Sequence, residues 1–243
     1  MPIFVPPGKD PVTIRAEAGK DMTFIDHDAH DIEVILEPGS TVTFVSLCNT
    51  QNASPARQLR SEVHEGARMH WLCVTRGDAQ GTHNLTSKCR GRNAKSQIDW
   101  IFLTREEEKQ KISVRNIFDA EGGEGEIALQ GIAEGKSVVS CKGMIEITER
   151  GKGTDAFLRE TTLMLDPTAK VDAVPGLEIR TNDVKASHAA TVTRVSPDDL
   201  FYFSARGIEE EEARRMFIEG FFLSLTQRLP VELQSFVSDM LEK

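Results

Sequence analysis

The residue best placed for chemistry is a lone histidine, His188, which lies between strand-like sequence and an abrupt change to helical sequence at Ser196. A neutral imidazole is a good ligand for iron and other transition metals. On the residues alone, however, an ordered strand histidine with a structural hydrogen bond is the simpler interpretation. The sequence therefore marks His188 as a candidate without assigning its role.

Four cysteines, Cys48, Cys73, Cys89 and Cys141, are the other potential metal ligands. None of them forms a CxxC pair, so their spacing predicts neither a zinc site nor a redox motif. In a reducing compartment we expect them to be small buried apolar residues or free thiols.

A group of acidic residues raises the alternative of a carbohydrate-active enzyme. Asp26, His27, Asp28 and Asp31 lie close together in the sequence. A polysaccharide lyase or hydrolase would also need aromatic side chains that stack on sugars, yet the chain has only two Trp and one Tyr. A turn rich in Asp and His explains the group more simply, so this enzyme is the less favoured alternative. A nucleotide-binding loop is not expected either, because Gly122-Gly-Glu-Gly has no lysine and no following helix.

Composition narrows the class of protein. The 243 residues carry a net charge of -9, which argues against a nucleic-acid binder because phosphate contacts need clustered cations. No apolar run approaches the roughly 20 residues that cross a bilayer, and the N-terminus has no secretory signal. We therefore expect a cytoplasmic protein without membrane or nucleic-acid partners.

The elements that must position these residues are strands over residues 12–193. Apolar and polar residues alternate with period two, as in residues 32–36, 41–45, 69–74 and 137–141. Turn residues recur with a rhythm: Gly39, Gly66 and Asn93 are each 27 residues apart. This weak repeat predicts a solenoid with stacked coils, and a parallel β-helix satisfies it. A β-sandwich would give similar alternation and is the rival architecture.

The pattern becomes helical at Ser196. Ser196-Pro-Asp-Asp predicts a capped helix start, and Gly207 is placed to end the first helix in a left-handed cap. A second helix follows from Glu209, and Pro230 begins a third. We therefore divide the chain into a β-helix core, 1–195, and a C-terminal helical domain, 196–243. These helices either cap the last coil or present apolar side chains to a partner.

Three segments resemble the SufB/SufD family, the scaffold proteins of iron–sulfur cluster assembly. They are residues 163–179, 182–192 and 199–207, and the resemblance covers roughly residues 158–222. It implies a mainly β fold, a right-handed parallel β-helix followed by a small C-terminal helical domain. It also implies a SufC-type ABC ATPase docked on those helices, and pairing with a second SufB/SufD-type chain, as homodimer or heterodimer, through the last coils. The chain is similar to a short, SufD-like member, for which we expect no helical N-terminal domain and no enzymatic activity of its own.

The resemblance also suggests where a transient iron–sulfur cluster would be held. His188 matches a histidine that is implicated in cluster assembly at the subunit interface of SufD-type chains. Glu160 aligns with the catalytic cysteine of SufB-type chains, and Ala186 stands where SufD-type chains often have a cysteine. A thiolate is the usual cluster ligand, so His188 and Glu160 are the candidate metal ligands, with a thiol such as Cys141 recruited from elsewhere. A surface charge beside Arg159 is the simpler interpretation of Glu160.

Two functional hypotheses follow from the resemblance. The first is a scaffold that takes part in cluster assembly and binds the ATPase through apolar residues of the C-terminal helices, namely Leu200, Phe201, Phe203, Phe217 and Phe221. The second is a structural partner that supports a separate, cysteine-bearing SufB-type chain without ligating metal itself.

Overall fold

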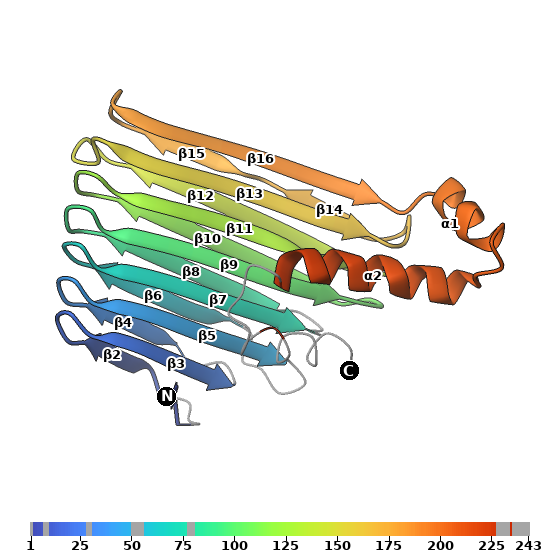
Figure 1. Cartoon of the computed structure of the whole chain (residues 1–243), viewed down its shortest axis with the longest axis horizontal. Coiled ribbons are helices and arrows are strands. Elements are labelled where there is room, and N and C mark those ends of the chain that lie inside the picture. The colour runs from blue at the N-terminus through green and yellow to red at the C-terminus, as the bar shows by residue number, and fades with distance from the viewer. Residues whose placement is uncertain are drawn as a thin grey trace.

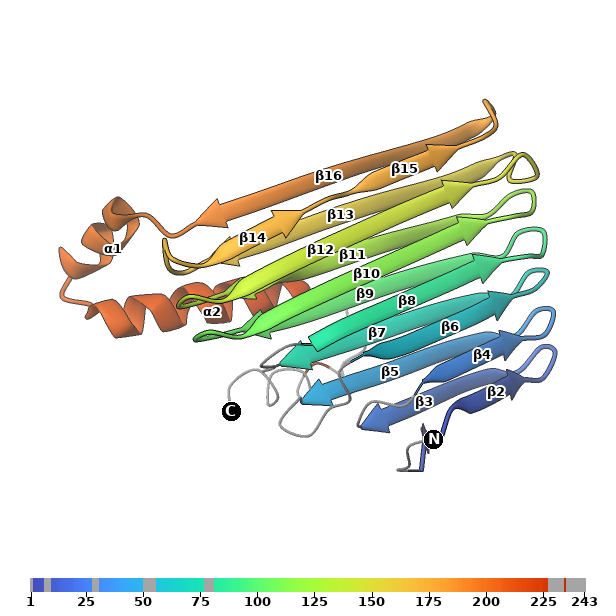
Figure 2. The ribbon, with the colours of Figure 1, turned by 180° about the vertical axis from the view of Figure 1, so that it is seen from behind.

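The strands of the chain wind into a parallel β-solenoid with two sheets (Figures 1 and 2). The structure is a computed structural model that describes residues 2–6, 10–27, 31–49, 56–76, 81–226 and 234. Successive strands alternate between the two sheets, and paired strands run parallel, as between β11 and β13 or β10 and β12. The first sheet contains, in spatial order, β1 (Ile3–Phe4), β3 (Asp21–His27), β5 (Thr41–Asn49), β7 (Arg68–Arg76), β9 (Lys95–Thr104), β11 (Glu124–Ala133), β13 (Thr154–Met164) and β16 (Val184–Arg194).

The second sheet is built from the even-numbered strands β2 to β14 and the short strand β15, whereas the first, odd-numbered sheet ends with β16. Both β14 and β15 pair with β12, so the last coil crosses this sheet in two pieces. The strands are β2 (Val12–Ala16), β4 (Ile32–Leu36), β6 (Arg57–Val63), β8 (Gly81–Cys89), β10 (Lys109–Phe118), β12 (Val138–Ile147), β14 (Lys170–Ala173) and β15 (Gly176–Ile179).

One corner of the solenoid is a stack of turns that share a left-handed residue. Gly39, Gly66 and Asn93 have φ values of 71°, 62° and 55°, a region that favours glycine and tolerates asparagine. The N–H of Gly39 donates to the carbonyl of Glu65 at 2.8 Å, and the N–H of Gly66 to Arg92 at 2.9 Å. The 27-residue rhythm in the sequence is therefore the length of one coil.

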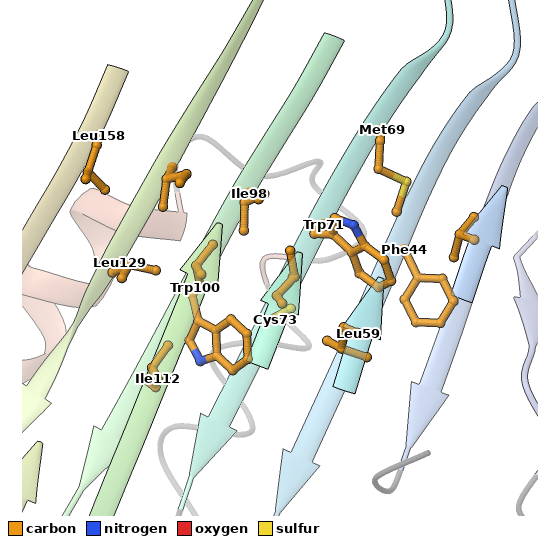
Figure 3. Packing of buried hydrophobic residues seen from close by; sticks show 14 of the residues in the cluster. Phe44, Leu59, Met69, Trp71, Cys73, Ile98, Trp100, Ile112, Leu129 and Leu158 are labelled. Atoms are coloured by element: carbon orange, nitrogen blue, oxygen red, sulfur yellow. The ribbon is translucent and has the colours of Figure 1, made fainter. Parts of the chain in front are cut away.

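The main core lies between the two sheets (Figure 3). Side chains at paired strand positions form continuous ladders, because a parallel register places equivalent residues of neighbouring coils one above the other. One ladder runs through Phe44, Trp71, Ile98, Ile127 and Leu158. Each of these side chains is fully buried, which gives the solenoid its apolar interior.

Two helices follow the last strand. Helix α1 (Pro197–Ser204) is capped by Ser196, whose hydroxyl accepts from the N–H of Asp199 at 3.1 Å. Gly207 has a φ of 76° and follows its C-terminus. Helix α2 (Glu210–Thr226) lies on the outer face of the odd-numbered sheet, where Phe222 joins a second apolar cluster with Val45, Leu72 and Leu163. The helix therefore crosses several coils and does not merely cap the last one.

The structure confirms the parallel solenoid and excludes the β-sandwich. The expected strands at residues 32–36, 41–45 and 69–74 are present, and the strand expected at 137–141 begins at Val138. The third helix expected from Pro230 lies outside the described residues, and the division into two domains at residue 195 stays a prediction. In the described part of the chain, no helix is long and apolar enough to span a membrane.

Candidate functional site

The candidate site lies at the last coil of the solenoid. Strand β16 is the final strand of its sheet, and among the described residues it pairs only with β13. His188 is paired with Leu158, so it continues the ladder of inward positions that is buried from Phe24 on β3 to Leu158 on β13. Its side chain is nevertheless exposed, as are those of Ala190 and Val192 on the same face. The end of the solenoid thus presents interior positions to solvent.

Glu160 lies one coil below this end and is buried. It occupies an inward position of β13, and only 1% of its surface is exposed. The N–H of Gly143 donates to its Oε1 at 2.8 Å. Its Oε2 is buried and has no hydrogen-bond partner among the residues that the structure describes. The interpretation of Glu160 as a surface charge beside Arg159 is therefore wrong, because the two residues point to opposite faces of the strand.

Gly143 lies where the pairing partner of β12 changes from β14 to β15. These two strands leave Val174 and Pro175 outside the ladder opposite the middle of β12. Pro175 has no N–H. A Cβ at position 143 would lie 2.5 Å from a Leu158 methyl and 3.0 Å from Glu160 Oε1, so a larger residue here would force these side chains to shift. A mid-strand glycine was the sequence signal that could have pointed to this contact.

Burial, with a smaller contribution from nearby Asp172, raises the pKa of the Glu160 carboxyl from 4.5 to about 7. The hydrogen bond from Gly143 acts in the opposite direction, because it stabilises the carboxylate. Near neutral pH the carboxyl therefore exists in both protonation states. Such a group can take up a proton or, when a cation arrives, release one.

His188 and Glu160 occupy inward positions on the neighbouring strands β16 and β13. His188 pairs with Leu158, and Ala190 pairs with Glu160. His188 and Glu160 therefore lie on adjacent strands, offset by two positions along the strand. Strand spacing and rise place their backbones roughly 8 Å apart. One imidazole and one carboxylate are an incomplete ligand set, and the described residues contain no group of three His, Cys, Asp or Glu that could hold a metal ion.

The four cysteines are buried thiols, as expected. Burial raises the pKa of Cys73 and of Cys89 to about 12, so both are neutral thiols at physiological pH. Cys141 faces inward on β12, two residues before Gly143, and burial together with Glu160 also raises its pKa. Among the cysteines, Cys141 is placed one coil below the open end, but as a thiol and not as a thiolate.

The acidic group near the N-terminus does not form a common site. Asp26 is buried and forms an ion pair with Arg57, whereas Asp31 accepts a hydrogen bond from the N–H of Gln58 at 2.8 Å. His27 stacks on Phe4 with ring centroids 6.2 Å apart. Asp28 lies outside the described residues. The sequence analysis missed the buried Asp26–Arg57 pair, since neither residue type marks an interior strand position.

The five apolar residues expected to bind a partner separate into two kinds. Leu200, Phe217 and Phe221 are partly buried against the second apolar cluster, and the ring of Phe203 packs on Phe217 at 5.4 Å. Only Phe201 is largely exposed, at 72%. Three further apolar side chains on the helices are exposed: Tyr202 on α1, and Met216 and Leu223 on α2.

The described part of the chain is thus a parallel β-solenoid followed by two helices. Residues 10–221 match the family described as SUF system FeS cluster assembly, SufBD core domain. Because this match covers most of the chain, the protein belongs to the SufBD family of iron–sulfur cluster assembly.

Individual relatives agree with this assignment. An iron–sulfur cluster assembly SufBD family protein of Mycobacterium bovis is 26% identical over 202 residues, which cover 83% of this chain and 24% of the relative. A SufBD family protein of Staphylococcus epidermidis is 27% identical over 202 residues, which cover 83% of this chain and 43% of the relative. The chain thus spans less than half the length of these curated relatives.

Proposed function

We propose that this chain is a non-enzymatic scaffold subunit of cytoplasmic iron–sulfur cluster assembly. Its family membership and the absence of an enzyme-like acidic site near Asp26 among the described residues support this proposal. The observation that carries it is the open end of the solenoid. There, an 11-residue edge strand, β16, exposes His188 above the buried carboxyl of Glu160.

Pairing with a second SufBD-type chain would cover this end. A long strand at the edge of a sheet offers unpaired backbone N–H and C=O groups to another strand. Exposed apolar side chains surround the edge: Val174 at 46%, Ile179 at 41% and Val192 at 47%. At the opposite end, β1 and β2 contain only 2 and 5 residues. The last coil therefore offers the longer pairing surface.

Sedimentation velocity tests this pairing. Val192→Lys should shift the chain, alone or mixed with a SufB-type chain, from dimer toward monomer. Ile3→Lys is the matched control, because Ile3 is exposed to a similar extent, 46%, at the opposite end. The proposal would be contradicted if the natural chain stayed monomeric at high concentration, both alone and mixed with a SufB-type chain.

Iron would be the cargo of this interface. His188 and Glu160 supply one nitrogen and one oxygen ligand from each chain, so pairing would complete a ligand set that one chain lacks. Anaerobic reconstitution with iron and sulfide should give visible absorbance that His188→Ala and Glu160→Gln both reduce. His64→Ala, at a distant corner of the solenoid, is the control. Equal absorbance in all variants would exclude these ligands.

An ABC ATPase of the SufC type would dock on the C-terminal helices. Phe201 and Tyr202 are exposed at 72% and 56%, and Met216 at 42%. Aromatic side chains with this exposure are typical centres of protein interfaces. Co-purification with the ATPase should be lost in Phe201→Ser/Tyr202→Ser. Phe4→Ser, an aromatic exposed at 62% near the other end, should leave it unchanged. Retained binding in the double variant would place the ATPase elsewhere.

A second candidate function is a structural partner without its own cluster ligands. It is favoured by the absence of a cysteine at positions 160 and 186 and by the neutral, buried thiols described above. Purification of the native complex separates the two functions. A second, cysteine-bearing scaffold chain in that complex, together with absorbance that does not depend on His188, would favour the structural role.

A further inference from the structure

A groove on the outer face of the odd-numbered sheet separates opposite charges. Its volume is about 650 Å³, and it lies over the first residues of β5, β7, β9, β11 and β13. The strip that α2 covers lies toward the other ends of these strands, as Figure 1 shows. The groove is therefore distinct from the open end and from the helix surface.

The charges follow one outward position across four paired strands. Arg68 and Lys95 on β7 and β9 are cations, whereas Glu124 and Asp155 on β11 and β13 are acids. Lys95 and Glu124 form an ion pair at 2.5 Å. Arg68 and Asp155 are exposed, and among the described residues their side chains have neither an ion-pair nor a hydrogen-bond partner.

This order of charges does not serve the stability of the sheet. Like charges at directly paired strand positions are unfavourable, and the groove has two such neighbours, Arg68 beside Lys95 and Glu124 beside Asp155. An alternating order would have paired all four residues. The arrangement instead leaves a positive and a negative group at opposite ends of the groove.

A second outward position adds polar and apolar contacts. His70 Nε2 lies 2.8 Å from Asp99 Oδ2, to which Gln97 also donates at 2.8 Å. These bonds fix the imidazole beside the cationic end. Phe157 forms part of the lining beside the acidic end. The groove can therefore accept a polar chain with one apolar contact near Asp155.

The distance between the unpaired charges selects the kind of ligand. Arg68 and Asp155 are three strand spacings apart, roughly 14 Å between their backbones. An extended peptide spans this distance with about four residues. We propose that the groove binds an extended peptide segment of another polypeptide, with an acidic residue at Arg68 and a basic residue at Asp155.

Capped synthetic pentapeptides provide the probe, and this test does not depend on the proposed role in cluster assembly. Glu-Thr-Thr-Thr-Lys should bind at low ionic strength at least fivefold more tightly than the same peptide with two Glu or two Lys ends. NMR titration should place the shifts at His70 and Gln97, and 0.5 M salt should weaken them. Equal affinity for the three peptides, or shifts confined to another surface, would overturn the proposal.

Charge reversal provides the second measurement. Asp155→Lys makes both ends of the groove cationic, so the preference should move to the peptide with two Glu ends. Arg68→Glu should move it to the peptide with two Lys ends. Lys109→Glu reverses an exposed charge on the outer face of the other sheet and should change nothing. An unchanged preference in folded Asp155→Lys protein would contradict the proposal.

Discussion

His83 and His188 occupy inward strand positions of the same solenoid, yet one is core and the other is surface. His83 on β8 lies between the coils of β6 and β10, is 3% exposed and packs 5.6 Å from the ring of Trp100. His188 on β16 has a neighbouring coil on one side only. In a solenoid, the next coil decides whether a side chain is available for chemistry. Interior residue types become accessible only where the stack ends.

The buried carboxyl groups near the two ends of the solenoid also differ, because only one of them has a cationic partner among the described residues. Near the N-terminus, the buried carboxylate of Asp26 is matched by the Arg57 guanidinium, which also donates to Ser46 at 2.5 Å. Near the open end, the buried carboxyl of Glu160 accepts one hydrogen bond, and none of the described residues places a cation beside it. The first carboxylate is therefore neutralised by a guanidinium, whereas the second is balanced by a raised pKa.

The largest effect on stability is expected when the buried ion pair between Asp26 and Arg57 is broken. Arg57→Met leaves Asp26 as an uncompensated buried charge, so the free energy of unfolding should fall by about 3–5 kcal/mol. Urea unfolding at pH 7 measures this loss. Adding Asp26→Leu to this variant should restore most of the stability, because no buried charge remains. A loss below about 1 kcal/mol for Arg57→Met would show that water reaches Asp26.

The fold could be predicted from the sequence because each coil repeats the same local signals. Period-two alternation and the left-handed residues Gly39, Gly66 and Asn93 are set by local chemistry, and each coil pairs in register with the next. The position of α2 could not be predicted, because its apolar face fits equally well on the last coil or on the outer sheet. The burial of Glu160 was also hidden, since alternation in β13 does not identify the inward face when a charged residue occupies it.

A smaller effect concerns the pH dependence of the open end. The pKa of Glu160 is about 7 in the folded chain and 4.5 in the unfolded chain, so folding takes up a proton between these values. The free energy of unfolding should therefore fall as the pH rises from about 4.5 to about 7, by at most about 3 kcal/mol. Glu160→Gln should abolish this contribution and be more stable than the natural chain at pH 8. Parallel pH profiles of the urea midpoints of both proteins would contradict the shift.

The interior histidine should give a pH dependence of opposite sign. Burial lowers the pKa of His83 from 6.5 to about 4, so the folded chain releases a proton that the unfolded chain binds. The free energy of unfolding should therefore fall as the pH drops from about 6.5 to about 4, again by at most about 3 kcal/mol. His83→Leu should remove this fall in the free energy of unfolding at acid pH. An NMR titration in which the His83 imidazole protonates near pH 6.5 would show that it is not buried as described.

The smallest effect on stability is expected at His188, since its exposed side chain should contribute little to the fold. His188 has no coil above it and its side chain is exposed, so His188→Ala should change the free energy of unfolding by no more than about 0.5 kcal/mol. His83→Ala removes a buried ring beside Trp100 and should cost several times more. Urea midpoints of the two variants at pH 7 measure the contrast. If His188→Ala costs as much as His83→Ala, the open end is already covered in the free chain, and the loss should then depend on protein concentration as expected for a dimer.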